Sequence, residues 1–115
     1  MIQLKKRRQE LHLNQNEIAA LLGLGDASVV SRHEAGLHAP DLRTAFAYQV
    51  IYGRALDKLF PDAFDEVAAD IAARATAFAA TLRGIPRDQR VNAVLRKLAE
   101  LTGDETIAYG ENTLW

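Results

Sequence analysis

Residues 23–36 read GLGDASVVSRHEAG, and this stretch decides how the N-terminal half of the chain is interpreted. Gly23 is well placed to end a preceding helix, because glycine adopts the left-handed backbone conformation at little cost. Asp26 is a good N-cap for a second helix, which Gly36 ends. That second helix is short, and Val30 lies on its apolar side. The stretch therefore predicts a tight turn followed by a small, half-polar helix.

The helix before the turn has a strong start signal. Asn14 can cap the following backbone amides, and Glu17, three residues later, can bond back to the Asn14 amide. An apolar stripe follows, formed by Ile18, Ala19, Leu21 and Leu22. Two short helices joined by a tight glycine-containing turn form the helix-turn-helix device.

The second helix, predicted to begin at Ala27, carries small and polar side chains on its outer side: Ala27, Ser28, Ser31 and Arg32. The B-DNA major groove is about 12 Å wide and admits one helix whose leading residues are small and polar enough to approach base edges. Serine and alanine are also common on inert helix surfaces. Taken alone, the pattern leaves a DNA-reading helix and a plain solvated surface both open.

Helix signals continue on both sides of this pair. We expect further helices over residues 4–11, 41–52, 56–60, 62–82 and 91–101, with turns at Gly53, Pro61 and 84–86. No strand alternation is present. The predicted fold class is all-α, with a five-helix domain over residues 1–61 and a helical hairpin and tail over residues 62–115. Residues 102–115 are expected to be irregular.

Composition narrows the functional classes. The chain has 115 residues and no cysteine, which excludes disulfides and thiolate zinc sites and fits a cytoplasmic location. No apolar run approaches the roughly 20 residues that span a bilayer, so neither a membrane span nor a cleaved signal is expected. The net charge is −1, yet residues 5–8 are all basic. Such a run suits either phosphate binding or a solvated helix face.

The residues taken in order resemble the lambda-repressor-like, or XRE-type, helix-turn-helix regulators. The resemblance covers residues 4–60, in the segments LKKRR, LNQNEIAALLGL, VSRHEAG and LDKLF. Each single match is common, whereas the ordered series is specific. The resemblance implies a transcription regulator whose DNA-binding domain covers residues 1–61 and binds double-stranded DNA, with a palindromic operator as the expected site. No nucleophile, base and orienting residue can be lined up from the sequence, so enzymatic activity is not expected.

The family pattern also implies roles for individual residues. Arg8 and Glu34 match a family ion pair that ties the first helix to the end of the third. Base-facing positions fall on Ala27, Ser28, Ser31 and Arg32. Phosphate-facing positions fall on Lys5, Lys6, Gln15, Asn16, His38 and Arg43. The alternatives are that Gln15 only starts a helix and that the lysines face solvent.

Two departures from the family pattern affect these assignments. One extra residue separates Gly23 from Ala27, and we expect Gly25 to absorb it. The register without an insertion would place Val29 in the core and Arg32 at an apolar position, which is less favourable because it buries a charge. His12 and His33 replace residues that the family prefers, and we interpret both as structural. The histidines have no metal-like spacing, so neither a metal nor a cofactor is expected.

The C-terminal part is predicted to mediate association. Phe64, Ile71 and Phe78 recur every seven residues, and with Leu82 they form a bulky stripe on an alanine-rich helix. This stripe suits homodimerisation, which would let two modules read neighbouring half-sites, or it covers the first domain of the same chain. The alternative function is that of an antitoxin-like or adaptor protein whose C-terminal segment binds another protein. Repression is the expected outcome of DNA binding.

Overall fold

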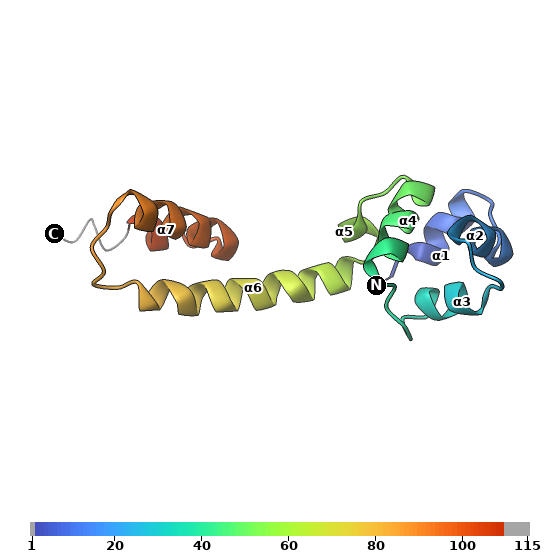
Figure 1. The fold of residues 1–115 in the computed structure, drawn as a ribbon, viewed down its shortest axis with the longest axis horizontal. Coiled ribbons are helices and arrows are strands. Elements are labelled where there is room, and N and C mark those ends of the chain that lie inside the picture. The colour runs from blue at the N-terminus through green and yellow to red at the C-terminus, as the bar shows by residue number, and fades with distance from the viewer. Residues whose placement is uncertain (1, 110–115) are drawn as a thin grey trace. The chain divides into compact units, whose positions relative to one another are not determined.

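The structure, a computed structural model, describes residues 2–109. Within this range the chain forms eight helices, α1 to α8, and no strand (Figure 1). The predicted all-α fold class is therefore confirmed. The chain divides into two compact units between Asp65 and Glu66, inside helix α6.

Five short helices and the start of a sixth make up the first unit. Their bounds are α1 Leu4–Glu10, α2 Gln15–Leu22, α3 Ser28–Glu34, α4 Leu42–Tyr52 and α5 Leu56–Leu59, followed by α6 Pro61–Thr81. Figure 1 shows α1 to α5 gathered into one compact group. Pro61, expected to separate two helices, is itself the first residue of α6, where its missing N–H is not needed.

Helix α2 begins and ends as the sequence predicts. The Asn14 side chain accepts a hydrogen bond from the Glu17 amide at 2.8 Å, and the Glu17 carboxylate accepts one from the Asn14 amide at 2.9 Å. Gly23 ends the helix with φ +78°. Because such a cap contributes about 1 kcal/mol, this short helix has a defined start independent of tertiary packing.

The turn into α3 differs in detail from the prediction. Helix α3 begins at Ser28, and its N-cap residue is Ala27, which has no capping side chain. The Asp26 carboxylate instead accepts the Ser28 amide at 2.7 Å, two residues on, as in an Asx turn. Gly25 does not take a left-handed conformation, and a Cβ there would meet no atom within 4 Å. The extra residue is thus accommodated without any need for glycine at position 25.

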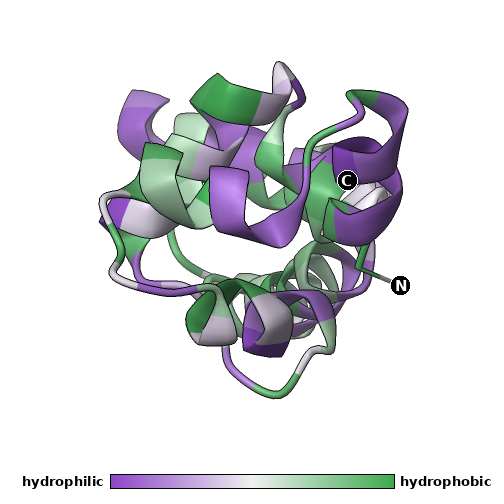
Figure 2. Cartoon of the chain, turned by 90° about the vertical axis from the view of Figure 1, so that its right-hand side faces the viewer, coloured by the Kyte–Doolittle hydropathy of each residue, from purple (hydrophilic) through white to green (hydrophobic). Residues whose placement is uncertain are grey.

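The core of the first unit brings all five short helices together. Its buried members are Leu4, Ile18, Ala19, Val30, Tyr48, Tyr52 and Leu59. Each helix carries hydrophobic and hydrophilic residues together (Figure 2), as amphipathic elements do. Burying one large apolar side chain contributes about 1.5–3 kcal/mol, so this shared core, rather than local propensity, holds the short helices in place.

Gly36 closes α3. It adopts φ +74°, and a Cβ at this position would lie 3.3 Å from the Cδ1 atom of Ile2. The Leu37 amide then donates to the Arg32 carbonyl at 3.0 Å. His12 also has a positive φ, 59°, a conformation that costs a residue with a side chain more than it costs glycine.

The second unit contains the rest of α6 together with α7 Gln89–Thr102 and α8 Thr106–Tyr109. The Asp88 carboxylate caps α7 by accepting the Val91 amide at 2.8 Å. The buried core of this unit consists of Ala75, Val91, Leu95 and Leu98. Ala75 is therefore the one buried residue that α6 contributes to this core, and α7 contributes the other three.

Leu82, predicted to take part in dimerisation, is half-buried and packs with Ala79 against the core formed by α6 and α7, and its role in a dimer stays a prediction. One expectation for the second unit is wrong. Residues 106–109, expected to be irregular, form α8, and Ile107 packs against the same core. The terminal Leu-Trp pair of the predicted arm lies outside the described residues.

Candidate nucleic-acid interface

Helix α3 separates a buried side from an exposed side. Val30 is fully buried and His33 is 3% exposed, whereas Ser28, Ser31 and Arg32 are exposed. The register with Val30 as the buried anchor is confirmed, because the other register would have placed Arg32 inward. Ala27 is half-buried and packs against the core, so it lies at the edge of the exposed surface rather than on it.

The exposed side of α3 has a mixed electrostatic character. The Arg32 guanidinium lies 3.5 Å from the Ser28 hydroxyl oxygen, one turn back, and has no closer hydrogen-bond partner among the described residues. The side chain and backbone amide of Ser28 hydrogen-bond to Asp26 and hold the pKa of its carboxyl below its ordinary value. Asp26 is consequently ionised at neutral pH and fixed at the start of the helix. Arg32 is left available to an external acceptor.

An ion pair fixes α3 to α1. The Arg8 Nε and Nη2 atoms donate to the two Glu34 carboxylate oxygens at 2.7 and 3.0 Å, in the bidentate geometry that arginine favours. The side chains of Arg8 and Glu34 are only 11% and 4% exposed. The hydrogen bond to Glu34 also raises the pKa of Arg8. Because Glu34 is the last residue of α3, the pair sets the position of the helix end.

Gln15 belongs to the same network. Its Nε2 atom donates to the Glu34 carboxylate at 2.9 Å, so the first turn of α2 is tied to the end of α3. One N–H of this amide remains for another acceptor. The structure thus gives Gln15 a positioning role that the sequence did not reveal, and a phosphate contact through its second N–H stays a prediction.

His33 anchors α3 to α4. Its Nδ1 atom is hydrogen-bonded to the Tyr48 hydroxyl at 2.8 Å, and its ring lies edge-on to those of Tyr48 and His38. Burial, together with the nearby His38, lowers the pKa of His33. Sequence analysis interpreted His33 as structural but did not identify its partner. The two residues are 15 positions apart in the sequence and lie on different helices, so no local pattern marked Tyr48 as the partner.

The Tyr52 hydroxyl is an unsatisfied group in the same core. It is fully buried and has no hydrogen-bond partner among the described residues. Its ring stacks on that of Tyr48 at a centroid distance of 5.7 Å. Burial raises the pKa of Tyr52 to about 12. The phenol therefore contributes packing and remains neutral throughout the physiological range.

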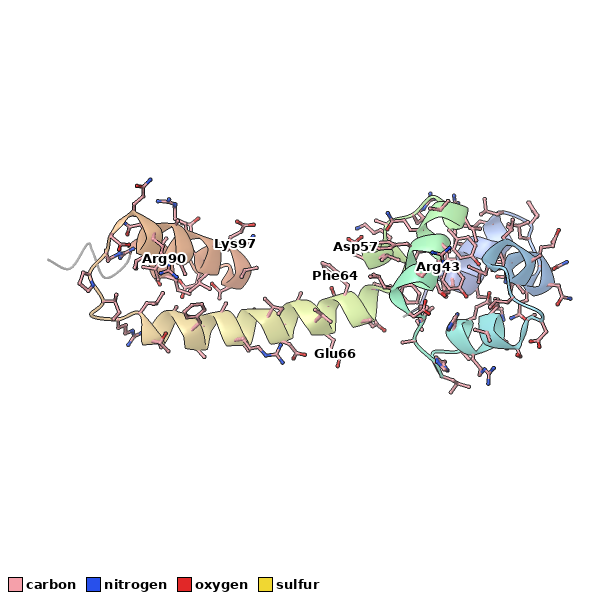
Figure 3. All side chains as sticks on the ribbon, in the orientation of Figure 1. Arg43, Asp57, Phe64, Glu66, Arg90 and Lys97 are labelled. Atoms are coloured by element: carbon pink, nitrogen blue, oxygen red, sulfur yellow. The ribbon has the colours of Figure 1, made fainter. Side chains whose placement is uncertain are left out.

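The residues predicted to contact phosphate lie on several elements of the first unit. Lys5, Lys6, Asn16, His38 and Arg43 are all exposed, and Arg43 lies near the start of α4 (Figure 3). Asp41 caps that helix by accepting the Thr44 amide at 2.8 Å. These side chains are available to a large anionic ligand, and their contacts with DNA remain predictions.

Residues 2–109 contain no group of three or more histidine, aspartate or glutamate side chains that could hold a metal ion. None of their helices has the length and apolar character needed to cross a membrane.

A short helix that follows a tight turn, buries one side and exposes small and basic residues on the other defines a helix-turn-helix domain. The helix-turn-helix family model matches residues 4–59, which confirms the resemblance to XRE-type helix-turn-helix regulators. The match supports DNA binding of the transcription-regulator type. No curated protein and no solved structure matches the chain.

Proposed function

We propose that the protein is a sequence-specific transcription regulator, most simply a repressor, that inserts α3 into the DNA major groove. The supporting observation is the two-sided character of α3. Val30 and His33 hold the helix to the core, and Ser28, Ser31 and Arg32 face solvent. The proposal assigns residues 1–61 to DNA binding and places the protein in the cytoplasm, without catalytic activity.

The proposed contacts divide into two kinds. Arg32 is the residue best suited to read a base, because a guanidinium donates two parallel hydrogen bonds to guanine O6 and N7. Ser28 and Ser31 are small enough to let the helix approach base edges. The exposed basic and polar residues on neighbouring elements bind phosphates and fix the orientation on the duplex, without reading sequence.

The rigidity of α3 supports this mechanism. Its end is fixed by the ion pair of Glu34 with Arg8, and its buried side is fixed by the hydrogen bond of His33 with Tyr48. A reading helix held in this way loses little conformational entropy on binding. The free energy of the base contacts made by Arg32 is then available for affinity, because little of it is needed to order the helix.

DNA binding is tested by selecting duplexes from a random pool and then measuring affinity by fluorescence anisotropy. Arg32→Ala should weaken binding to the selected duplex by about 1–3 kcal/mol and relax specificity at one base pair. Arg96→Ala, which removes an exposed arginine from the second unit, should leave affinity unchanged. Equal affinities for the wild type and Arg32→Ala would remove Arg32 from the reading surface.

The proposal includes a homodimer formed through residues 62–115. Phe64, Ile71 and Phe78 of α6 are 53%, 39% and 50% exposed, whereas the neighbouring Ala75 is buried in the core with α7. The bulky side chains of this helix are therefore left uncovered while the small ones pack inside. A dimer would also place two reading helices on half-sites about one DNA turn, roughly 34 Å, apart.

Dimerisation is tested by sedimentation equilibrium of the full chain. Ile71→Glu combined with Phe78→Glu should give a monomer, because it places two carboxylates in the proposed interface. Ala73→Glu, which adds a charge on the opposite side of α6, is the matched control and should stay dimeric. A double variant that still sediments as a dimer would refute the assignment.

A second candidate is an adaptor or antitoxin-like protein that binds another polypeptide. It is favoured by a separate apolar face on α4, where Leu42, Phe46 and Val50 are 69%, 52% and 81% exposed at four-residue spacing. Affinity purification with Phe46→Glu as the comparison tests it. A stoichiometric partner that the wild type retains and Phe46→Glu loses would favour this function.

A further inference from the structure

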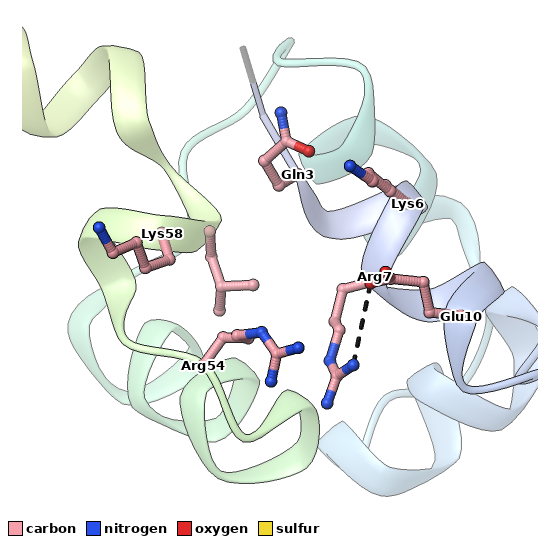
Figure 4. Close-up of a pocket in the computed structure, with 7 residues that line it drawn as sticks. Gln3, Lys6, Arg7, Glu10, Arg54 and Lys58 are labelled. Carbon is pink, nitrogen blue, oxygen red and sulfur yellow. Dashed lines mark ion pairs between the residues drawn. The ribbon is translucent and has the colours of Figure 1, made fainter.

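A cleft lies on the first unit between the N-terminal helix and the turn that leads into α5. It has a volume of about 180 Å³ and is lined by Gln3, Lys6, Arg7, Glu10, Arg54, Lys58 and Leu59 (Figure 4). None of the lining residues belongs to α2 or α3. The cleft is therefore separate from the proposed reading surface.

The lining of this cleft is strongly basic. Four of the seven residues are cationic and one, Glu10, is anionic, although the chain as a whole has a net charge of −1. The Arg7 Nη1 atom is 3.8 Å from the Glu10 carboxylate, which is itself 49% exposed. This single, loosely held carboxylate cannot neutralise four cations. Like charges gathered in one concavity repel one another unless an external anion joins them.

The donors that face the cleft are partly committed and partly free. The Arg7 Nε atom donates to the Tyr52 carbonyl at 2.8 Å, which fixes this guanidinium against the end of α4 and leaves its Nη2 atom available. The Arg54 Nη1 atom makes one long contact, 3.3 Å, to the adjacent Gly53 carbonyl. Lys6 and Lys58 are exposed, and their amines have no hydrogen-bond partner among the described residues.

The walls of the cleft are held together without any ligand. The Gln3 amide donates to the Leu59 carbonyl at 2.9 Å, which joins the start of α1 to the end of α5. The bond from Arg7 joins α1 to the end of α4. Since both walls belong to packed helices, an anion entering the cleft meets donors that are already close to their binding positions.

We propose that this cleft binds a phosphate group. A phosphate presents several oxygens in a tetrahedral arrangement, which suits guanidinium and ammonium donors converging from two walls better than the planar pair of oxygens of a carboxylate. The phosphate comes either from the DNA backbone or from a small phosphate-bearing molecule. Both sources use the same chemistry.

The test measures pyrophosphate binding by isothermal titration calorimetry at constant ionic strength. Arg54→Ala combined with Lys58→Ala removes two exposed cations from the cleft, and Arg90→Ala combined with Arg96→Ala removes two from the exposed surface of α7 as the matched control. The cleft variant should raise the dissociation constant at least ~tenfold, while the control should match the wild type. Thermal unfolding of the variants checks that all of them fold.

A second arm distinguishes the two sources of phosphate. If the cleft variant also binds the selected duplex more weakly than the control does, the phosphate belongs to the DNA backbone. If duplex affinity is unchanged while pyrophosphate binding falls, the cleft serves a free phosphate-bearing molecule. The proposal would be overturned if the cleft variant bound both pyrophosphate and the duplex as tightly as the control variant does. Because the calorimetric arm needs no DNA, its result is independent of the proposed regulator function.

Discussion

Replacing Arg8 with methionine should destabilise the first unit by about 3 kcal/mol. The Arg8–Glu34 pair is bidentate, at 2.7 and 3.0 Å, and its side chains are 11% and 4% exposed. It is therefore not a surface pair of the kind worth about 0–1 kcal/mol. Removing one partner of a buried pair costs about 3–5 kcal/mol, because the other charge is left without compensation.

The lower end of that range applies here for a structural reason. Glu34 keeps the hydrogen bond from Gln15 at 2.9 Å when Arg8 is removed, so its carboxylate is not wholly unpartnered. The variant also loses the bond from Arg8 to the Leu13 carbonyl, at 3.2 Å. A loss of about 3 kcal/mol is a large part of the roughly 5–15 kcal/mol that holds an ordinary domain together.

The measurement is urea unfolding followed by near-ultraviolet circular dichroism, because two buried tyrosines lie in the core of this unit. Arg8→Met, Glu34→Gln and the double variant complete a cycle that isolates the coupling between the two side chains. Lys5→Ala, an exposed change on the same helix, should stay within about 0.5 kcal/mol of the wild type. A loss below about 1 kcal/mol for Arg8→Met would refute the view that the pair fixes α3.

Tyr52→Phe should leave the free energy of unfolding unchanged or raise it by up to about 2 kcal/mol, because it removes a buried hydroxyl that lacks a partner. Tyr48→Phe should lower the free energy of unfolding by about 1 kcal/mol, because it removes the hydrogen bond to His33. Equal denaturation midpoints for the two variants would contradict this. Stability should fall as the pH drops from 7 toward 5. In the unfolded chain His33 takes up a proton near the ordinary histidine pKa of 6.5, whereas burial lowers its pKa in the folded chain, so acid favours the unfolded state. This part of the pH dependence should vanish in His33→Leu. Gly36→Ala should cost about 1–2 kcal/mol, given φ +74° at that position, and an unchanged melting temperature would show that the strain is absent.

Sequence alone predicted the features that depend on local chemistry. The capping box of α2 and the glycine that ends it use residues within four positions of one another, so their pattern is readable along the chain. The buried side of α3 was also predictable, because only one register keeps Arg32 out of the core. The family resemblance added the Arg8 and Glu34 roles, which no local pattern contains.

The remaining features depend on tertiary contacts. Asp26 was expected to be the N-cap residue of α3, but its carboxylate accepts the Ser28 amide in an Asx turn. The sequence could not distinguish the two, because an aspartate before a helix is typical of both. Leu82 fits a periodic stripe equally well whether it packs on α7 or faces a partner. The hydrogen bond of Gln15 to Glu34 and the basic cleft between α1 and α5 join residues far apart in the sequence, and such pairs have no periodicity to reveal them.

Methylation interference on the selected duplex tests the central claim most directly, because it reports which groove α3 occupies. Guanine N7 lies in the major groove and adenine N3 in the minor groove, and dimethyl sulfate modifies both. Interference should come from guanine N7 within each half-site, and Arg32→Ala should abolish it at one guanine. Interference confined to adenine N3, or the same guanine pattern with Arg32→Ala as with the wild type, would contradict the reading of the major groove by α3.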